Sequence, residues 1–61
     1  MNKIKEFRIK AGLTQAQLAE MIGRPQQNVA RWENDQVAPS VKTLMQLAKA
    51  LKCAVSDLIE E

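Results

Sequence analysis

Histidine and tyrosine are absent from this 61-residue chain, and cysteine, phenylalanine and tryptophan occur once each. Because Cys53 has no second cysteine or histidine to pair with, an intrachain disulfide and a Cys/His zinc site are both excluded. The scarcity of aromatic residues and the lack of alternating Val, Ile and Thr runs argue against a β-sheet. With 46% hydrophobic residues and only two glycines and two prolines, the chain is expected to fold. The composition therefore favours a small helical protein.

Long apolar runs and targeting signals are also missing. No segment approaches the ~20 apolar residues that span a bilayer, and no signal-peptide pattern opens the chain. A single unpaired cysteine is typical of a reducing compartment. We therefore expect a cytoplasmic protein without membrane association, folded as one domain over residues 1–61. This length is near the lower limit for a domain without disulfides or bound metal.

The features that most enzymes need are absent as well. The chain has no histidine, no glycine-rich phosphate loop, and no carboxylate pair at a helical spacing that would also face a cleft. Chains this short rarely enclose a substrate. We predict that the protein is not an enzyme and uses no cofactor or metal.

Charge is distributed unevenly along the chain. Residues 1–52 carry nine basic and four acidic side chains, a net charge of +5, whereas the last nine residues carry three acidic side chains and no basic one. A basic body suits a polyanion such as DNA, with the acidic end pointing away from it. On charge alone, a mixed surface that only confers solubility explains the pattern equally well.

Residues 13–33, LTQAQLAEMIGRPQQNVARWE, predict two short helices joined by a glycine turn. Thr14 and Gln17 have the spacing of a capping box, in which each side chain bonds a free backbone N–H of the first turn. Gly23 is expected to end the first helix in a left-handed conformation. Pro25 is expected to begin the second helix, because its φ is already helical.

The second of these helices has a narrow apolar edge formed by Val29 and Trp32. Its other side chains face outward and include Gln26, Gln27, Asn28 and Arg31. A glutamine amide can bond N6 and N7 of adenine together in the major groove, and Arg31 can take a guanine or a phosphate. Asn28 can face a base or the backbone of the DNA. The alternative is a generic polar surface. Trp32 is interpreted as core rather than as a base-stacking residue.

Helices are also predicted on both sides of this segment. The first should run from an N-cap at Asn2 to Gly12, with a buried face of Ile4, Phe7, Arg8 and Ala11. Ser40 should cap a later helix, whose apolar stripe is Leu44, Leu47, Ala48 and Leu51. A short helix from Val55 or Ser56 closes the core.

The two short helices resemble the helix-turn-helix of phage-repressor-like (Cro/C1-type, XRE-type) bacterial regulators. The matching positions are Gln15, Ala19, Gly23, Val29, Trp32 and the pair Glu33-Asn34. The resemblance extends through Ile4, Phe7, Arg8, residues 12–14, 39–40 and 44–51, and the closing SDLIE, so it covers nearly the whole chain. It implies an all-α, compact five-helix lambda-repressor-like fold with the helix-turn-helix at helices 2 and 3.

The resemblance also implies roles for single residues. Arg8 typically pairs with the glutamate that ends the recognition helix, here Glu33; alternatively, Arg8 extends over Phe7 to solvent. Gln15, at a helix N-terminus that favours anions, is a candidate phosphate contact. Weaker phosphate candidates, for which a solvated surface is equally plausible, are Arg24, Asn34 and Lys42.

Four positions depart from the family pattern, and one of them is Ala54, which falls where a Ser or Thr often caps the last helix. Pro25 stands where Ser or Thr is usual, which removes a hydroxyl contact to phosphate. Asp35 and Lys52 stand where glycine is common, so a positive φ at Lys52 would cost on the order of 1 kcal/mol.

The function expected from these features is that of a sequence-specific regulator of transcription, usually a repressor in such families, which reads the major groove of double-stranded DNA with helix 3. An antitoxin that represses its own operon and also binds a toxin is an alternative. A protein-interaction module that never touches DNA is another.

A homodimer that is weak without DNA is also expected, because one such domain reads too few base pairs for genomic discrimination. Two copies would read a palindromic operator. The chain ends just after its fifth helix, so the expected dimer surface is the C-terminal one, formed by Cys53, Val55, Leu58 and Ile59.

Overall fold

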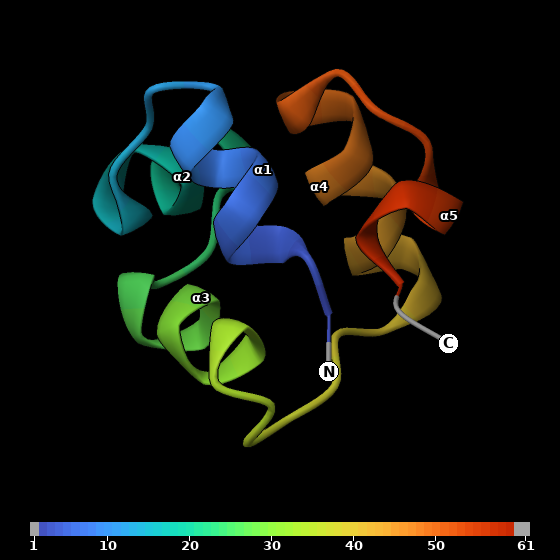
Figure 1. Cartoon of the computed structure of the whole chain (residues 1–61). Helices are drawn as coiled ribbons and strands as arrows, with labels where there is room; N and C mark the ends of the chain where they lie inside the picture. Colours follow the sequence, from blue (N-terminus) through green and yellow to red (C-terminus); the bar gives the residue numbers. More distant parts are fainter. Residues whose placement is uncertain (1, 60–61) are drawn as a thin grey trace.

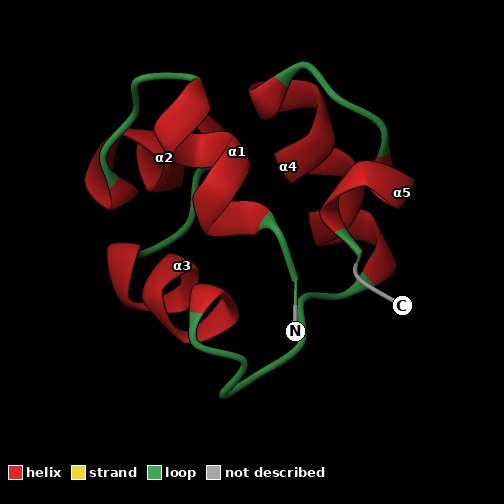
Figure 2. Ribbon diagram, viewed as in Figure 1, coloured by secondary structure: helices red, strands yellow, loops and turns green. Residues whose placement is uncertain are grey.

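The computed structural model describes residues 2–59, which contain five helices (Figure 1). They are α1 (Ile4–Lys10), α2 (Gln15–Ile22), α3 (Gln26–Glu33), α4 (Val41–Leu51) and α5 (Val55–Leu58). Figure 2 shows helices joined by loops, with no strand among the described residues. In the view of Figure 1, α2 and α3 lie on the left and α4 and α5 on the right, with α1 between them in the picture, and α2 packs directly against both α3 and α4. The predicted all-α, five-helix fold is confirmed.

The turn between α2 and α3 forms as the sequence predicts. The Thr14 hydroxyl accepts from the Gln17 backbone N–H at 3.0 Å, and the Gln17 carboxamide oxygen accepts from the Thr14 N–H at 2.8 Å. Gly23 ends α2 at φ +68°. The Arg24 N–H returns to the Ala19 carbonyl at 3.0 Å, which satisfies a carbonyl of the last turn.

Pro25 does not begin α3, contrary to the expectation from its ring. Its φ is −61°, but its ψ of 144° is extended, so Pro25 is the N-cap and α3 begins at Gln26. The reason is that the proline ring fixes φ and leaves ψ free. Pro25 offers no side-chain oxygen to the first turn, which leaves the N-terminal N–H groups of α3 without a side-chain cap.

The core lies where the five helices meet. Ile4, Leu18, Val29, Leu47 and Leu58 have no exposed surface, so every helix contributes one fully buried side chain. Trp32 is 5% exposed, which confirms that it belongs to the core. Burying an aliphatic side chain of this size contributes about 1.5–3 kcal/mol.

α1 is shorter at both ends than the sequence suggested. Lys3 is the residue before the helix, although the Asn2 side chain still accepts from the Ile4 N–H at 3.0 Å. At the other end, Ala11 is the C-cap and is exposed, so it does not continue the buried face. Gly12, at φ +74°, turns the chain toward α2.

The two residues that stand where the family commonly has glycine, Asp35 and Lys52, both adopt a left-handed backbone conformation. Asp35 has φ +59° and Lys52 has φ +56°. For Lys52 this conformation costs on the order of 1 kcal/mol relative to glycine, because the Cβ atom crowds the following carbonyl, whereas a short polar side chain such as that of Asp35 tolerates it better. α5 begins at Val55, and Asp57 accepts from the Ala54 N–H at 2.9 Å in place of a capping hydroxyl.

Candidate nucleic-acid interface

α3 has one buried edge and one exposed face. Val29 is fully buried and Trp32 nearly so, and this fixes the rotation of the helix about its axis. The opposite face exposes Gln26, Gln27 and Arg31, with Asn28 partly exposed beside them. The exposed side chains are amides and a guanidinium, the groups that hydrogen-bond base edges. The arrangement is that of a polar reading surface on a helix anchored by two apolar residues.

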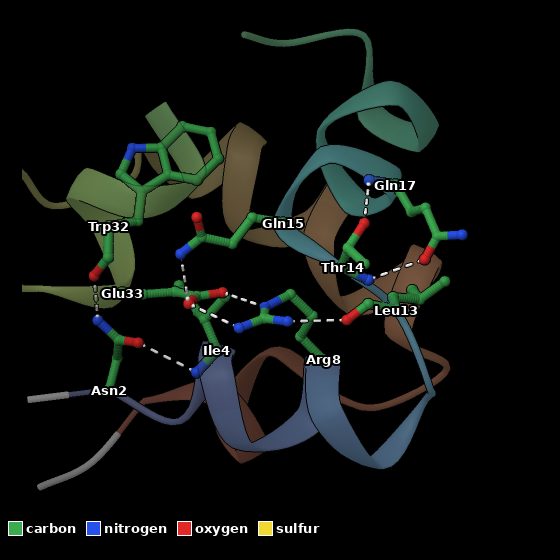
Figure 3. A network of polar contacts seen from close by, with 9 residues as sticks. All are labelled: Asn2, Ile4, Arg8, Leu13, Thr14, Gln15, Gln17, Trp32 and Glu33. Atoms are coloured by element: carbon green, nitrogen blue, oxygen red, sulfur yellow. Dashed lines mark hydrogen bonds and ion pairs between the residues drawn. The ribbon is translucent and has the colours of Figure 1, made fainter. Parts of the chain in front are cut away.

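An ion pair between Arg8 and Glu33 ties α1 to the end of α3 (Figure 3). The Arg8 Nε donates to Glu33 Oε2 at 2.6 Å, and its Nη2 donates to Oε1 at 3.2 Å. The Arg8 side chain is 11% exposed and that of Glu33 is 2% exposed, so the guanidinium does not extend to solvent. Because the contact is bidentate, it fixes both the distance and the angle between the two groups.

The same ion pair reaches the beginning of α2. Arg8 Nη1 donates to the Leu13 carbonyl at 2.8 Å, in the loop before α2. Gln15 Nε2, on the first residue of α2, donates to Glu33 Oε1 at 3.0 Å. Figure 3 shows the carboxylate of Glu33 between the arginine and the glutamine. One carboxylate therefore holds the Gln15 carboxamide beside the N-terminus of α2.

The weaker phosphate candidates are not all gathered in one place. Arg24, Asn28 and Arg31 line one shallow hollow of about 240 Å³, which they share with residues 37–40. Asn34 and Lys42 are exposed but do not line this hollow. Asn34 is the C-cap of α3 and Lys42 lies in the first turn of α4.

Asn2 holds the C-terminal end of α3, a role that the sequence did not reveal. Its Nδ2 donates to the Trp32 carbonyl at 2.7 Å and to Asp35 Oδ1 at 2.9 Å, while its Oδ1 accepts from Ile4. Figure 3 shows the contacts to Trp32 and Ile4. The partners are 30 and 33 residues away in sequence, so no local spacing could indicate them. The only signal was that asparagine is a good N-cap.

The C-terminal surface differs in one residue from the predicted dimer surface. Leu58 has no exposed area, so its side chain cannot contact a partner, and the prediction was wrong for this residue because the monomer core needs it. Ile59 is 47% exposed, while Cys53 and Val55 are half-buried. Glu60 and Glu61, which add to the acidic charge of this end, lie outside the described residues.

The surroundings of Cys53 favour the thiol over the thiolate. Burial raises the pKa of its thiol, and the nearby Asp57 carboxylate raises the pKa further. Both effects disfavour the thiolate, which is the nucleophilic form. The environment of Cys53 is that of a packing residue.

Among residues 2–59, none of the helices combines the length and the apolar character that crossing a bilayer requires.

Comparison with known proteins agrees with this geometry. The sequence pattern of the helix-turn-helix family matches residues 4–58. The chain is 33% identical to YgzD, an uncharacterized HTH-type transcriptional regulator of Bacillus subtilis. The 57 aligned residues make up 93% of this chain and 86% of YgzD. It is 30% identical over 56 residues to an uncharacterized HTH-type transcriptional regulator of Archaeoglobus fulgidus, covering 92% of this chain and 80% of the relative.

A third relative is a named repressor. The chain is 31% identical to the repressor protein C2 of Salmonella phage P22. The 58 aligned residues make up 95% of this chain but only 27% of that longer protein. With the buried edge of α3 and the glycine turn before it, these matches establish the family. The chain belongs to the Cro/C1-type (XRE-type) helix-turn-helix family of DNA-binding transcriptional regulators and has a lambda-repressor-like fold.

Proposed function

We propose that this protein is a sequence-specific repressor of transcription that inserts α3 into the major groove of double-stranded DNA. The observation that carries the proposal is the orientation of α3, which buries Val29 and Trp32 and exposes Gln26, Gln27 and Arg31. The resemblance to a phage protein named as a repressor supports the sign of regulation. Such a regulator acts where prokaryotic DNA lies, in the cytoplasm.

The two glutamines select the sequence in this mechanism. They are adjacent at the start of α3, about 100° apart around the helix, so they can reach neighbouring base pairs. Each carboxamide both donates and accepts, which matches N6 and N7 of adenine. Arg31 is on the last turn of α3 and takes a guanine or a phosphate, with Asn28 beside it.

Phosphate contacts from α2 fix the position of α3 on the duplex. Glu33 uses one of the two amide hydrogens of Gln15, and the other can donate to a phosphate beside the free N–H groups of the α2 N-terminus. Arg24, Asn34 and Lys42, which lie on other parts of the surface, are weaker candidates for additional phosphate contacts. These contacts carry no sequence information, so they set affinity and its dependence on salt.

The functional unit is a homodimer on a palindromic operator, weak in free solution. The half-sites lie about one helical turn, roughly 34 Å, apart. Exposed apolar side chains fit this contact, because Ile59 is 47% and Val37 52% exposed. Val37 and Ile59 line one hollow together with Leu44. Binding to adjacent half-sites consolidates a contact of this small size.

In vitro selection from a randomised DNA library tests the proposal, followed by fluorescence anisotropy on the enriched sequence at several salt concentrations. Gln26→Ala and Gln27→Ala should each cost roughly 1–3 kcal/mol on that sequence and relax the preference at one base position. Gln15→Ala should weaken binding to all sequences alike.

Gln36→Ala is the matched control, because it removes an exposed glutamine outside α3 and should keep the base preference. No enriched sequence from the selection, the result expected of a pure protein-interaction module, would refute the proposal. An unchanged base preference in both α3 variants would refute the assignment of the reading residues.

A further inference from the structure

An apolar groove runs between the C-terminal ends of α1 and α4 and the outer face of α2. It has a volume of about 550 Å³, and we name it the α1/α4 groove. Two further hollows, of about 370 and 470 Å³, adjoin it, and Met21 lines all three. The apolar floor of the α1/α4 groove consists of Phe7, Leu13, Met21, Ala50 and Leu51.

The floor exposes more apolar surface than the core requires. Met21 is 55% exposed on the outer face of α2, and Phe7 and Leu13 are only half-buried, although both pack against the core. A polar residue at position 21 would serve the fold equally well, because the neighbouring buried positions of α2 are Leu18, Ala19 and Ile22. The partly exposed side chains of Phe7, Leu13 and Met21, from α1, α2 and the loop between them, are thus gathered in one groove instead of being scattered over the surface.

Lysines border the groove on two sides. Lys10 lies at the end of α1 with its Nζ atom 5.1 Å from the centre of the Phe7 ring, so its charge is held over the floor. Lys52 lines the same groove from the end of α4, and Lys49 lines the adjoining hollow. Within residues 2–59, Glu20, on the α2 side, is the one acidic side chain that lines any of these three hollows. The charged side chains that line the three hollows are therefore mainly basic.

Helix ends alone do not explain these lysines. A basic residue in the last turn complements the helix dipole, which accounts for Lys10 and Lys49 individually. The dipole does not require an apolar floor between them. Lys52 has φ +56°, a conformation that glycine adopts without penalty. The backbone conformation at position 52 therefore does not explain why the residue is a lysine.

The α1/α4 groove is separate from the candidate DNA interface. None of its lining residues comes from α3, and neither Gln15 nor Arg24 lines it. Figure 1 shows the C-terminal ends of α1 and α4 at the top of the view, away from α3. A partner in the groove can bind while α3 is occupied.

We propose that the α1/α4 groove binds an acidic amphipathic helix of a partner protein. The apolar face of the helix covers Met21 and Phe7, and its flanking carboxylates reach Lys10 and Lys52. Charge complementarity selects this occupant, because a basic or neutral helix would leave the lysines unpaired beside an apolar contact. The proposal stands whether or not α3 reads DNA.

The test uses the full chain and a phage-displayed library of random peptides of about 16 residues. As a helix, such a peptide is roughly 24 Å long, close to the 27 × 23 × 19 Å dimensions of the domain. The enriched peptides should be acidic, with apolar residues at helical spacing. The ¹⁵N-labelled protein, titrated with a synthetic copy of the strongest peptide, should show shifts at Met21, Ala50 and Lys52 and none at Gln26 or Arg31.

Charge reversal supplies a gain-of-function test. The K10E/K52E variant should bind the acidic peptide at least about tenfold more weakly and should bind a copy of the peptide with its acidic residues replaced by lysine. A gain of binding cannot arise from misfolding. The matched control is K3E/K5E, which makes the same change in net charge at exposed positions that do not line the groove.

Several results would overturn the proposal. They are the absence of enriched peptides, an enriched set that is not acidic, and equal binding of the acidic peptide to K10E/K52E and to the parent protein. Shifts at the groove residues that grow with protein concentration in the absence of peptide would assign the groove to a second copy of this chain instead.

Discussion

Removing either partner of the Arg8–Glu33 ion pair should destabilise the domain severely. In Arg8→Met, the Glu33 carboxylate, 2% exposed, keeps only the hydrogen bond from Gln15 and loses both arginine donors. In Glu33→Leu, the guanidinium keeps only the Leu13 carbonyl. An uncompensated buried charge of this kind costs about 3–5 kcal/mol.

That cost is large on the scale of the whole domain. At about 0.05–0.15 kcal/mol per residue, a chain of 61 residues has a free energy of unfolding of roughly 3–9 kcal/mol. Each single variant should therefore lose between about a third and all of the domain's free energy of unfolding. The double variant R8M/E33L replaces both charges with apolar groups of similar volume and should recover most of the loss.

Urea denaturation followed by Trp32 fluorescence measures these differences, because Trp32 is the sole tryptophan and lies in the core. The double-mutant cycle should give a coupling free energy of about 2 kcal/mol or more. Glu6→Gln, which changes an exposed carboxylate on the same helix as Arg8, is the control and should stay within about 0.5 kcal/mol of the parent. Single variants that each lose less than about 1 kcal/mol, or a coupling near zero, would refute the reasoning.

Three further predictions concern the C-terminal half and the turns. Leu58→Ala should lower the free energy of unfolding, measured by urea denaturation, by about 2–5 kcal/mol. Ile59→Ser should leave the thermal midpoint nearly unchanged and reduce only the cooperativity of operator binding. The reverse pattern would show that Leu58 lies at the surface. Lys52→Gly should raise the free energy of unfolding by up to about 1 kcal/mol. Gly23→Ala should lower the free energy of unfolding by about 1–2 kcal/mol through backbone strain alone, because Gly23 has φ +68° and the new Cβ would meet open space. Equal effects of the same sign in the two variants would contradict this reasoning. Because burial and Asp57 raise the pKa of Cys53, iodoacetamide should label the folded protein slowly until the pH rises above the usual thiol range, and faster labelling than in urea-unfolded protein at the same pH would disprove the assignment.

The parts of the fold that the sequence predicted are those with local causes. The capping box at Thr14 and Gln17, the left-handed Gly23 and the buried edge of α3 each depend on residues within a few positions of one another. Helix ends were less predictable. Pro25 fixes φ but not ψ, so the ring alone could not show whether it begins α3 or precedes it.

Contacts between residues far apart in the sequence could not be predicted from the local spacing of residue types. The Arg8–Glu33 pair joins residues 25 positions apart, and it was expected only because of a family resemblance. Nothing comparable pointed to Asn2, whose partners lie in α3 and the loop after it. The burial of Leu58 was ambiguous for another reason, since a short amphipathic helix can turn the same leucine to the core or to a partner.

The polar contacts around α3 bear directly on recognition. Val29 and Trp32 are the buried apolar residues of this helix, and they lie only three positions apart, so apolar packing fixes its rotation more firmly than its tilt. Its C-terminal end is held by Arg8 through Glu33 and by Asn2 through the Trp32 carbonyl. Base readout needs side chains placed within a fraction of an ångström, because hydrogen bonds weaken steeply with distance and angle. A variant such as Asn2→Ala should therefore reduce discrimination between operator and random DNA by more than its loss of stability explains, when both are measured at a temperature where the domain is fully folded. Equal losses of affinity for the two DNAs would show that α3 is held by its apolar edge alone.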